Sequence, residues 1–172
     1  MENLKSLYSQ PLTWTFKNKK IILQSGTENI IELTEVKHSK ASFELDGKNY
    51  SIRNEGFWNA KTIIDKEGKQ SLILKRDFLG SKGRIQFENG NLYYCKISNS
   101  PLAKLSFFNK DGKEIFHYKL DATKKPRTVL KIIDNSLNQN ELLMLIILGC
   151  YSFQGIVREN DDSDFLMLVA GA

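Results

Sequence analysis

The chain has 172 residues and a mass of 19.7 kDa, which fits one folded domain of roughly 100 to 200 residues. Hydrophobic residues make up 41% of the chain, charged residues 26%, and three residues are proline, which excludes a disordered, collagen-like or disulfide-rich chain. Two histidines and two cysteines leave little for metal binding or nucleophilic catalysis. We therefore expect one non-enzymatic domain over residues 1–172, with no cofactor, no catalytic residue and no metal site.

The formal net charge is +5, and it is unevenly distributed along the chain. Residues 1–130 hold 23 of the 25 Lys and Arg and 14 of the 20 Asp and Glu, a net charge of +9, whereas residues 131–172 carry a net charge of −4. A basic excess favours anionic partners such as phospholipid headgroups or nucleic acid. Because the lysines are scattered at nearly regular intervals, a solvated lysine-rich surface is the plainer interpretation of this charge.

Two features bear on the cellular compartment. Cys95 and Cys150 are far apart and form no CxxC motif, so we expect two reduced core residues. Residues Met1–Ser9 lack the apolar stretch of a cleaved secretion signal, which predicts a cytoplasmic location.

Up to about residue 133, apolar residues alternate with polar ones as in half-buried strands, and glycine turns separate the runs. The clearest hairpin spans Gly83–Ile97, in which Asn89-Gly90 predicts a type I′ turn. We expect three more hairpins, at Asp46-Gly47, Glu67-Gly68 and Asp111-Gly112. Further strands are predicted over residues 12–16, 21–24, 29–36 and 128–133. Such a sheet must close or be covered, because bare edges invite aggregation.

The pattern changes near residue 138. Asn138 followed by Glu141 resembles a capping box, in which the Asn side chain accepts a hydrogen bond from a free backbone N–H and Glu reaches back. Leu142–Phe153 is apolar on every side, as in a helix buried in a protein core or in a membrane. This run of about 12 residues is shorter than the roughly 20 that cross a bilayer, so we expect a buried helix of about 20 Å. After it, Arg158–Asp164 predicts a polar loop and Phe165–Val169 a short strand.

The meander followed by one wholly apolar helix resembles the tubby C-terminal superfamily, which includes the tubby, phospholipid scramblase and LURP-one-related families. The similarity is carried by the hairpins around Trp58, Asp65-Lys66-Glu67-Gly68 and Gly90, and above all by the helix Glu141–Phe153. It implies a mainly β fold in which a closed antiparallel barrel of about 12 strands surrounds a C-terminal hydrophobic helix. Tubby proteins bind phosphoinositides through basic residues on the barrel, so the resemblance also implies a peripheral membrane role. The proline-rich N-termini and cysteine clusters of scramblases are missing from this chain.

The most concentrated basic group consists of Lys75, Arg76, Lys82 and Arg84, which flank a turn containing Gly80 and Gly83. If the turn brings the two strand ends together, these four cations share one rim that can clamp a phosphate. Two weaker basic clusters are Lys17, Lys19 and Lys20, and Lys124, Lys125 and Arg127. Ordinary solvated loop charges remain the simpler interpretation of all three clusters.

Other candidate sites are weaker. His38 and His117 lack a ligand spacing, so we expect surface histidines, and no GxSxG, HExxH, P-loop or GxGxxG motif occurs. The acidic run Asp161, Asp162 and Asp164 has oxygen ligands for calcium but lacks the pattern of an EF-hand, which favours a solvated turn. Nucleic-acid binding needs aromatic residues among Lys and Arg on one exposed face. It is disfavoured here because Tyr93 and Tyr94 lie on opposite faces and most aromatic residues are expected in the core.

The functional expectation is a non-enzymatic cytoplasmic domain that binds anionic phospholipid headgroups or a membrane surface through its basic rim. Two alternatives stay open: a protein-interaction or structural module, and an enzyme whose site lies in the barrel mouth without a sequence motif. The oligomeric state is not predicted.

Overall fold

The structure is a computed structural model. It describes residues 12–17, 20–25, 27–34, 40–56, 60–77, 79–99, 102–121, 127–134, 136–159 and 168–170. In this part of the chain there are 13 strands and one helix. The elements are β1 (Leu12–Lys17), β2 (Lys20–Ser25), β3 (Glu28–Thr34), β4 (Lys40–Leu45), β5 (Lys48–Glu55), β6 (Lys61–Lys66), β7 (Lys69–Arg76), β8 (Lys82–Phe87), β9 (Leu92–Ser98), β10 (Lys104–Phe108), β11 (Glu114–Asp121), β12 (Arg127–Ile132), α1 (Gln139–Glu159) and β13 (Leu168–Ala170). The predicted class, mainly β with one helix near the C-terminus, is confirmed.

The four predicted hairpins all occur, and two of them have type I′ turns. Asp46-Gly47 and Glu67-Gly68 have positive φ at both residues, as a type I′ turn requires. At the other two hairpins only Gly90 and Gly112 have positive φ, so the type I′ prediction at Asn89-Gly90 is wrong. There the Gly90 N–H donates to the Phe87 carbonyl at 3.0 Å and the Asn89 side chain accepts from the Asn91 N–H at 3.0 Å, which stabilises a longer loop.

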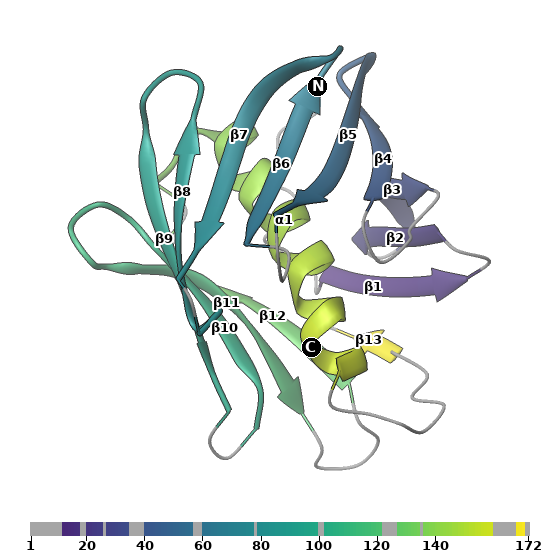
Figure 1. The fold of residues 1–172 in the computed structure, drawn as a ribbon. Coiled ribbons are helices and arrows are strands. Elements are labelled where there is room, and N and C mark those ends of the chain that lie inside the picture. Colours follow the sequence, from purple (N-terminus) through teal and green to yellow (C-terminus); the bar gives the residue numbers. More distant parts are fainter. Residues whose placement is uncertain are drawn as a thin grey trace.

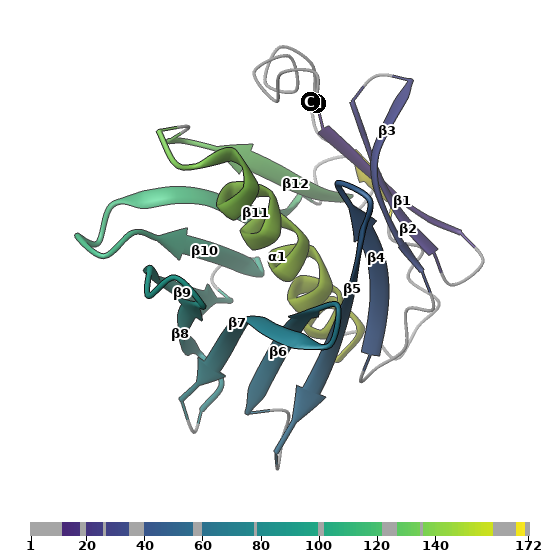
Figure 2. The ribbon, with the colours of Figure 1, turned by 90° about the horizontal axis from the view of Figure 1, so that it is seen from above.

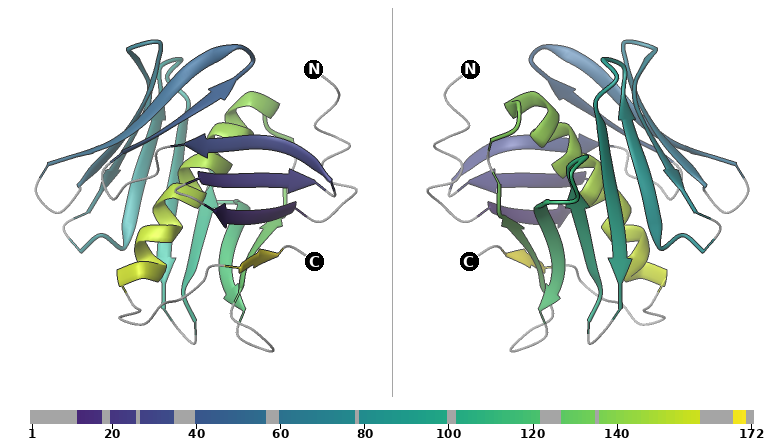
Figure 3. Two further views of the ribbon diagram at one scale, coloured as in Figure 1. Left: turned by 90° about the vertical axis from the view of Figure 1, so that its right-hand side faces the viewer. Right: turned by 90° about the vertical axis from the view of Figure 1, so that its left-hand side faces the viewer.

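The strands β1 to β12 pair antiparallel with their sequence neighbours. The short β13 pairs antiparallel with β1 and parallel with β12, so the order of pairings returns to its start. Figure 1 shows β13 beside β1, and the view in Figure 2 shows the sheet curving around α1, with β10–β12 on one side and β4–β5 on the other. The left view of Figure 3 shows α1 running obliquely behind β1–β3.

The helix α1 begins where the sequence predicts. Asn138 Oδ1 accepts hydrogen bonds from the backbone N–H groups of Asn140 at 2.9 Å and Glu141 at 3.4 Å, which is the expected N-cap. The helix runs to Glu159, however, so it is about 31 Å long rather than 20 Å, and Arg158–Glu159 belongs to it rather than to a loop. Among the described residues, no helix has the length and hydropathy needed to cross a membrane.

The core lies between α1 and the inner face of the sheet. All residues from Leu142 to Tyr151 other than Gly149 have buried side chains, and Leu145, Ile147 and Leu148 have no exposed surface. This burial on all sides explains why the helix is apolar all round. Gly149 lets the helix approach the sheet, because a Cβ atom there would lie 2.5 Å from Tyr118 Cε2 and 3.0 Å from Phe107 Cε2. Cys95 and Cys150 are both buried, as predicted.

Candidate functional site

Five cations gather on the outer face of strands β6–β9. Strand pairing places Lys61 of β6 opposite Lys75 of β7, Lys75 opposite Arg84 of β8, and Lys82 of β8 opposite Lys96 of β9. All five side chains are exposed. We call these residues the outer basic patch: Lys61, Lys75, Lys82, Arg84 and Lys96. Its longest row, Lys61, Lys75 and Arg84, lies on three neighbouring strands and so spans about 10 Å.

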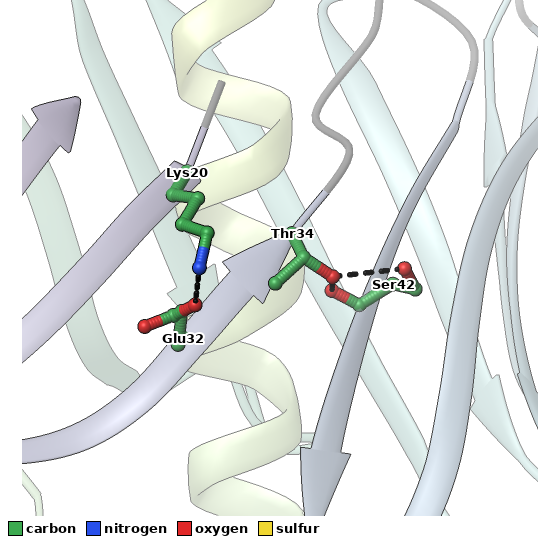
Figure 4. Close-up of polar contacts among 4 residues, drawn as sticks. All are labelled: Lys20, Glu32, Thr34 and Ser42. Carbon is green, nitrogen blue, oxygen red and sulfur yellow. Dashed lines mark hydrogen bonds and ion pairs between the residues drawn. The ribbon is translucent and has the colours of Figure 1, made fainter. Parts of the chain in front are cut away.

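None of the five cations forms an ion pair with a residue that the structure describes. Several cations elsewhere on the protein do. Lys20 Nζ lies 2.6 Å from Glu32 Oε1 across β2 and β3, beside the Thr34 and Ser42 hydroxyl groups that lie 3.1 Å apart (Figure 4). Further pairs are Arg53 with Asp65 at 2.7 Å, Lys104 with Glu114 at 2.9 Å and Lys113 with Asp134 at 2.7 Å. The outer basic patch therefore has positive charge that no ion pair with a described residue neutralises, although the charge of Lys82 interacts with that of the nearby Asp77.

Two carboxylates at the margin of the patch are engaged elsewhere. Glu55 lies opposite Lys61 in the pairing of β5 with β6, but it contacts Arg53. Asp77 accepts hydrogen bonds from Ser81 Oγ and the Lys82 backbone N–H, each at 3.2 Å, within the β7–β8 connection. The backbone hydrogen bond from Lys82 is the main cause of a lowered pKa for Asp77, so this carboxylate stays charged while it stabilises the turn.

The patch places like charges directly opposite one another on neighbouring strands. Such pairs destabilise a sheet, by about 0.2–1 kcal/mol for a typical cross-strand interaction. Three occur here, namely Lys61 with Lys75, Lys75 with Arg84, and Lys82 with Lys96. Like-charge pairs also occur outside the patch, for example Lys66 with Lys69, so the pairs alone do not mark a binding surface.

Tyr94 lies within the patch. It is opposite Arg84 in the pairing of β8 with β9 and opposite Phe108 in the pairing of β9 with β10. Alternation along β9 puts Tyr94 and Lys96 on the outer face, and Tyr93 and Cys95 on the inner face. Tyr94 is 40% exposed, so the expectation that the aromatic residues are core does not hold at this position.

Of the four cations predicted to share a rim, the structure brings together three. Lys75, Lys82 and Arg84 are neighbours on the outer face, whereas Arg76 points the opposite way because it follows Lys75 in the same strand. Its guanidinium donates to Thr62 Oγ1 at 3.1 Å and to Ser152 Oγ of α1 at 3.0 Å. The placement of Arg76 in the rim is therefore wrong, and this residue links the sheet to the helix. Gly83 is likewise part of β8 and not of the turn, and a Cβ atom there would meet Leu74 at 2.5 Å.

The other predicted candidates have mixed outcomes. Lys20 is ion-paired with Glu32, as described above. His117 is not a surface histidine: its side chain is 15% exposed, and its Nδ1 lies 3.0 Å from Glu114 Oε1. Burial, followed by the nearby charge of Lys104, lowers the pKa of His117. The remaining predicted residues lie outside the described part of the chain or have side chains that are not described: Lys17, Lys19, Lys124, Lys125, Arg127, His38, Trp58 and the run Asp161, Asp162 and Asp164.

At the opposite end of β8 and β9, Glu141 does not complete the predicted capping box. Its carboxylate accepts hydrogen bonds from Asn89 Nδ2 at 2.7 Å, Asn91 Nδ2 at 2.8 Å and the Tyr93 hydroxyl at 2.6 Å. Burial opposes its charge, but these three hydrogen bonds outweigh burial and lower the pKa of Glu141. The contacts fix the β8–β9 hairpin, which carries three of the five patch residues, to the start of α1.

Sequence reasoning missed Lys61, Lys96 and Tyr94. Each is exposed by simple alternation, and the position of Lys96 opposite Lys82 follows from the hairpin register once the loop at Gly90 is known. The neighbours of Lys61 could not be inferred so directly, because they depend on two further hairpins. Within the described residues, no group of three or more His, Cys, Asp and Glu side chains is placed to hold a metal ion.

Comparison with known proteins gives one informative similarity. No protein-family model matches the chain, and no solved structure matches it. The chain is similar to a tRNA(Met) cytidine acetate ligase of Clostridium novyi (strain NT), at 29% identity over 150 residues. The matched part is 87% of this chain and 34% of the ligase, so the chain spans about a third of that relative.

This similarity corrects the functional expectation. The relative is an enzyme whose name specifies a ligation that involves tRNA(Met), which conflicts with a non-enzymatic domain that binds phospholipid headgroups. The physical reason for the error is that unpaired surface cations attract any polyanion, and charge alone does not distinguish a lipid surface from an RNA backbone.

Proposed function

We propose that this domain binds RNA, of the tRNA class, through the outer basic patch. The observation that carries the proposal is the group of five exposed cations on one face of β6–β9, none of which forms an ion pair with a described residue. The name of the ligase that the chain is similar to supports the choice of tRNA as the polyanion.

Phosphate oxygens accept hydrogen bonds from Lys and Arg, and the release of counterions from the nucleic acid drives such binding. Arg84 can bind a phosphate with two parallel hydrogen bonds, whereas the four lysines act as point charges. If all five cations contact phosphates, the logarithm of the association constant should fall with the logarithm of salt concentration with a slope of about −3.5 to −4.5.

The proposal is tested with tRNA(Met) transcribed in vitro and the full chain, by fluorescence anisotropy at about 0.1 M salt. The triple variant Lys75→Gln/Lys82→Gln/Arg84→Gln should bind about tenfold more weakly, because each exposed ion pair contributes several tenths of a kcal/mol. The matched control is Lys48→Gln/Lys69→Gln/Lys110→Gln, which removes three exposed charges at the far hairpin turns. Equal loss in both triple variants would mean that net charge, and not the patch, determines binding.

We assign to this domain the holding of RNA, and the match, which covers a third of the ligase, does not place the chemical step. If the domain itself carries out chemistry, the candidate site is the group of interior hydrogen bonds from Arg76 to Thr62 and Ser152. Loss of ligase activity in Ser152→Ala, with unchanged RNA binding, would favour that alternative. Binding of tRNA also agrees with the expected cytoplasmic location.

We further infer that the sheet is a closed barrel around α1, as the resemblance to the tubby superfamily implies. Support comes from the pairing of β13 with both β1 and β12, and from the burial of α1 on all sides. Deletion of residues 160–172 should then speed hydrogen exchange of amides in β1 and β12 but not in β6 and β7. Unchanged exchange in β1 and β12 would indicate an open sheet.

A further inference from the structure

Tyr94 differs from the other aromatic residues of the described chain. Several aromatic side chains pack against one another in pairs, such as Phe107 with Phe116 at a centroid distance of 4.5 Å and Phe43 with Tyr50 at 4.9 Å. Tyr94 makes no ring contact, hydrogen bond or ion pair with any described residue. Its 40% exposure leaves part of the ring open to solvent on the outer face.

The surroundings of this ring are cationic. Arg84 lies directly opposite on β8, Lys96 lies two residues further along β9 on the same face, and Lys82 is opposite Lys96. Directly opposite positions on neighbouring strands have Cβ atoms about 4.5–5.5 Å apart, so a phosphate bound by Arg84 lies within one nucleotide of the Tyr94 ring. On the other side, Phe108 of β10 lies opposite Tyr94 in the strand pairing and is half-buried.

An exposed aromatic ring among cations is the arrangement that holds single-stranded nucleic acid. The cations follow the backbone, and each unpaired base has a π-face that stacks on an aromatic side chain. A duplex hides these faces, so a ring on the outer face of the sheet contributes nothing to duplex binding. We propose that Tyr94 stacks on an unpaired base and that the outer basic patch therefore prefers single-stranded RNA to duplex RNA.

This inference rests on the proposed RNA binding and specifies the part of the RNA that is held. A purely structural role for Tyr94, as apolar cover for the outer face beside Phe108, predicts something different. Leucine would provide similar cover without a π-face, whereas phenylalanine would keep the π-face and lose only the hydroxyl group. The two variants Tyr94→Leu and Tyr94→Phe thus separate stacking from cover.

The experiment measures binding of the full chain to a fluorescent 12-nucleotide RNA without secondary structure and to a 12-base-pair RNA duplex. The native chain should prefer the single strand. Tyr94→Leu should bind the single strand about 5- to 100-fold more weakly and the duplex unchanged, because stacking on one base is lost. Tyr94→Phe should bind both RNAs as the native chain does. Circular dichroism and thermal unfolding of each variant verify that the fold is kept.

Three outcomes would overturn the inference: native single-strand affinity in Tyr94→Leu, an equal loss for single strand and duplex, or an effect of Tyr94→Leu confined to binding of phosphatidylserine vesicles. Failure of the broader proposal looks different. If the triple variant of Lys75, Lys82 and Arg84 binds both RNAs like the native chain, the patch does not bind RNA at all. If that variant loses both RNAs while Tyr94→Leu loses neither, the patch binds RNA without stacking.

Discussion

The Tyr118 hydroxyl donates a hydrogen bond of 2.7 Å to the backbone carbonyl of Ile146, in the middle of α1. Tyr118 is fully buried, and its ring packs against Phe116 and Phe153. Burial raises the pKa of the Tyr118 hydroxyl well above the usual value, which favours the protonated form that donates this hydrogen bond. This contact fixes both the depth and the rotation of the helix against β11.

We expect Tyr118→Phe to lower the free energy of unfolding by about 0.5–1.5 kcal/mol, the usual contribution of one hydrogen bond. The Ile146 carbonyl keeps its helical acceptor role, so the loss should not be larger. Tyr94→Phe removes a hydroxyl that makes no hydrogen bond with the described residues and should leave stability unchanged. Urea denaturation of both variants gives the comparison, and equal effects would show that the Tyr118 bond adds nothing.

The helix α1 lies so close to the sheet at Gly149 that Gly149→Ala should change stability in the opposite direction from a usual Gly→Ala substitution in a helix. In an open helix, Gly→Ala stabilises by about 1 kcal/mol because alanine is the better helix former. Here the added Cβ would lie 2.5 Å from Tyr118 and 3.0 Å from Phe107, so we expect Gly149→Ala to destabilise the protein by about 1–3 kcal/mol. A rise in the thermal unfolding midpoint of this variant would refute the close packing of α1 on β10 and β11.

Burial of the helix predicts that a charge in its middle is not tolerated. Leu145 has no exposed surface, and an unpaired carboxylate at this position would cost several kcal/mol, so Leu145→Asp should unfold the domain. Asn140→Asp is the matched control, because it adds the same charge at the exposed first turn, where the helix dipole favours it. Circular dichroism should show loss of structure in the first variant alone. A cooperatively folding Leu145→Asp protein would contradict a central helix.

The hydrogen bonds to Glu141 make stability depend on pH. Because folding lowers the pKa of Glu141 from its usual 4.5, its contribution is complete above that value. The contribution is lost as the pH falls through the lower folded pKa. Glu141→Gln should therefore reduce stability at pH 7 and flatten the decline at acidic pH. The exposed residue Glu28 provides the control Glu28→Gln, and unfolding curves at several pH values should separate the two variants. Parallel declines in native and Glu141→Gln proteins would exclude this role.

The hairpins and the helix were predictable because their signals are local. Glycine at a turn, alternation along a strand and an apolar run after Asn138 each act within about ten residues. The candidate site was predictable only in part. Lys75 and Arg76 are adjacent in sequence, and this proximity obscured the fact that neighbours in a strand face opposite ways.

The remaining differences between the sequence predictions and the structure depend on contacts between segments that are far apart in the sequence. Glu141 leaves the capping box because Tyr93 and two asparagine side chains, about fifty residues away, offer three hydrogen bonds in place of one. The length of α1 was underestimated because its last turns extend beyond the apolar run. The cluster of Lys61 with Lys75 and Arg84 requires the register of three strands at once, which no local pattern contains.

The measurement that tests RNA binding by the outer basic patch most directly is lysine modification of the native chain with and without tRNA(Met), read out by mass spectrometry. Bound tRNA should protect Lys61, Lys75, Lys82 and Lys96 from the reagent and leave Lys48, Lys69 and Lys110 as reactive as in the free protein. Unchanged reactivity at the four patch lysines under conditions in which tRNA is bound would contradict the account.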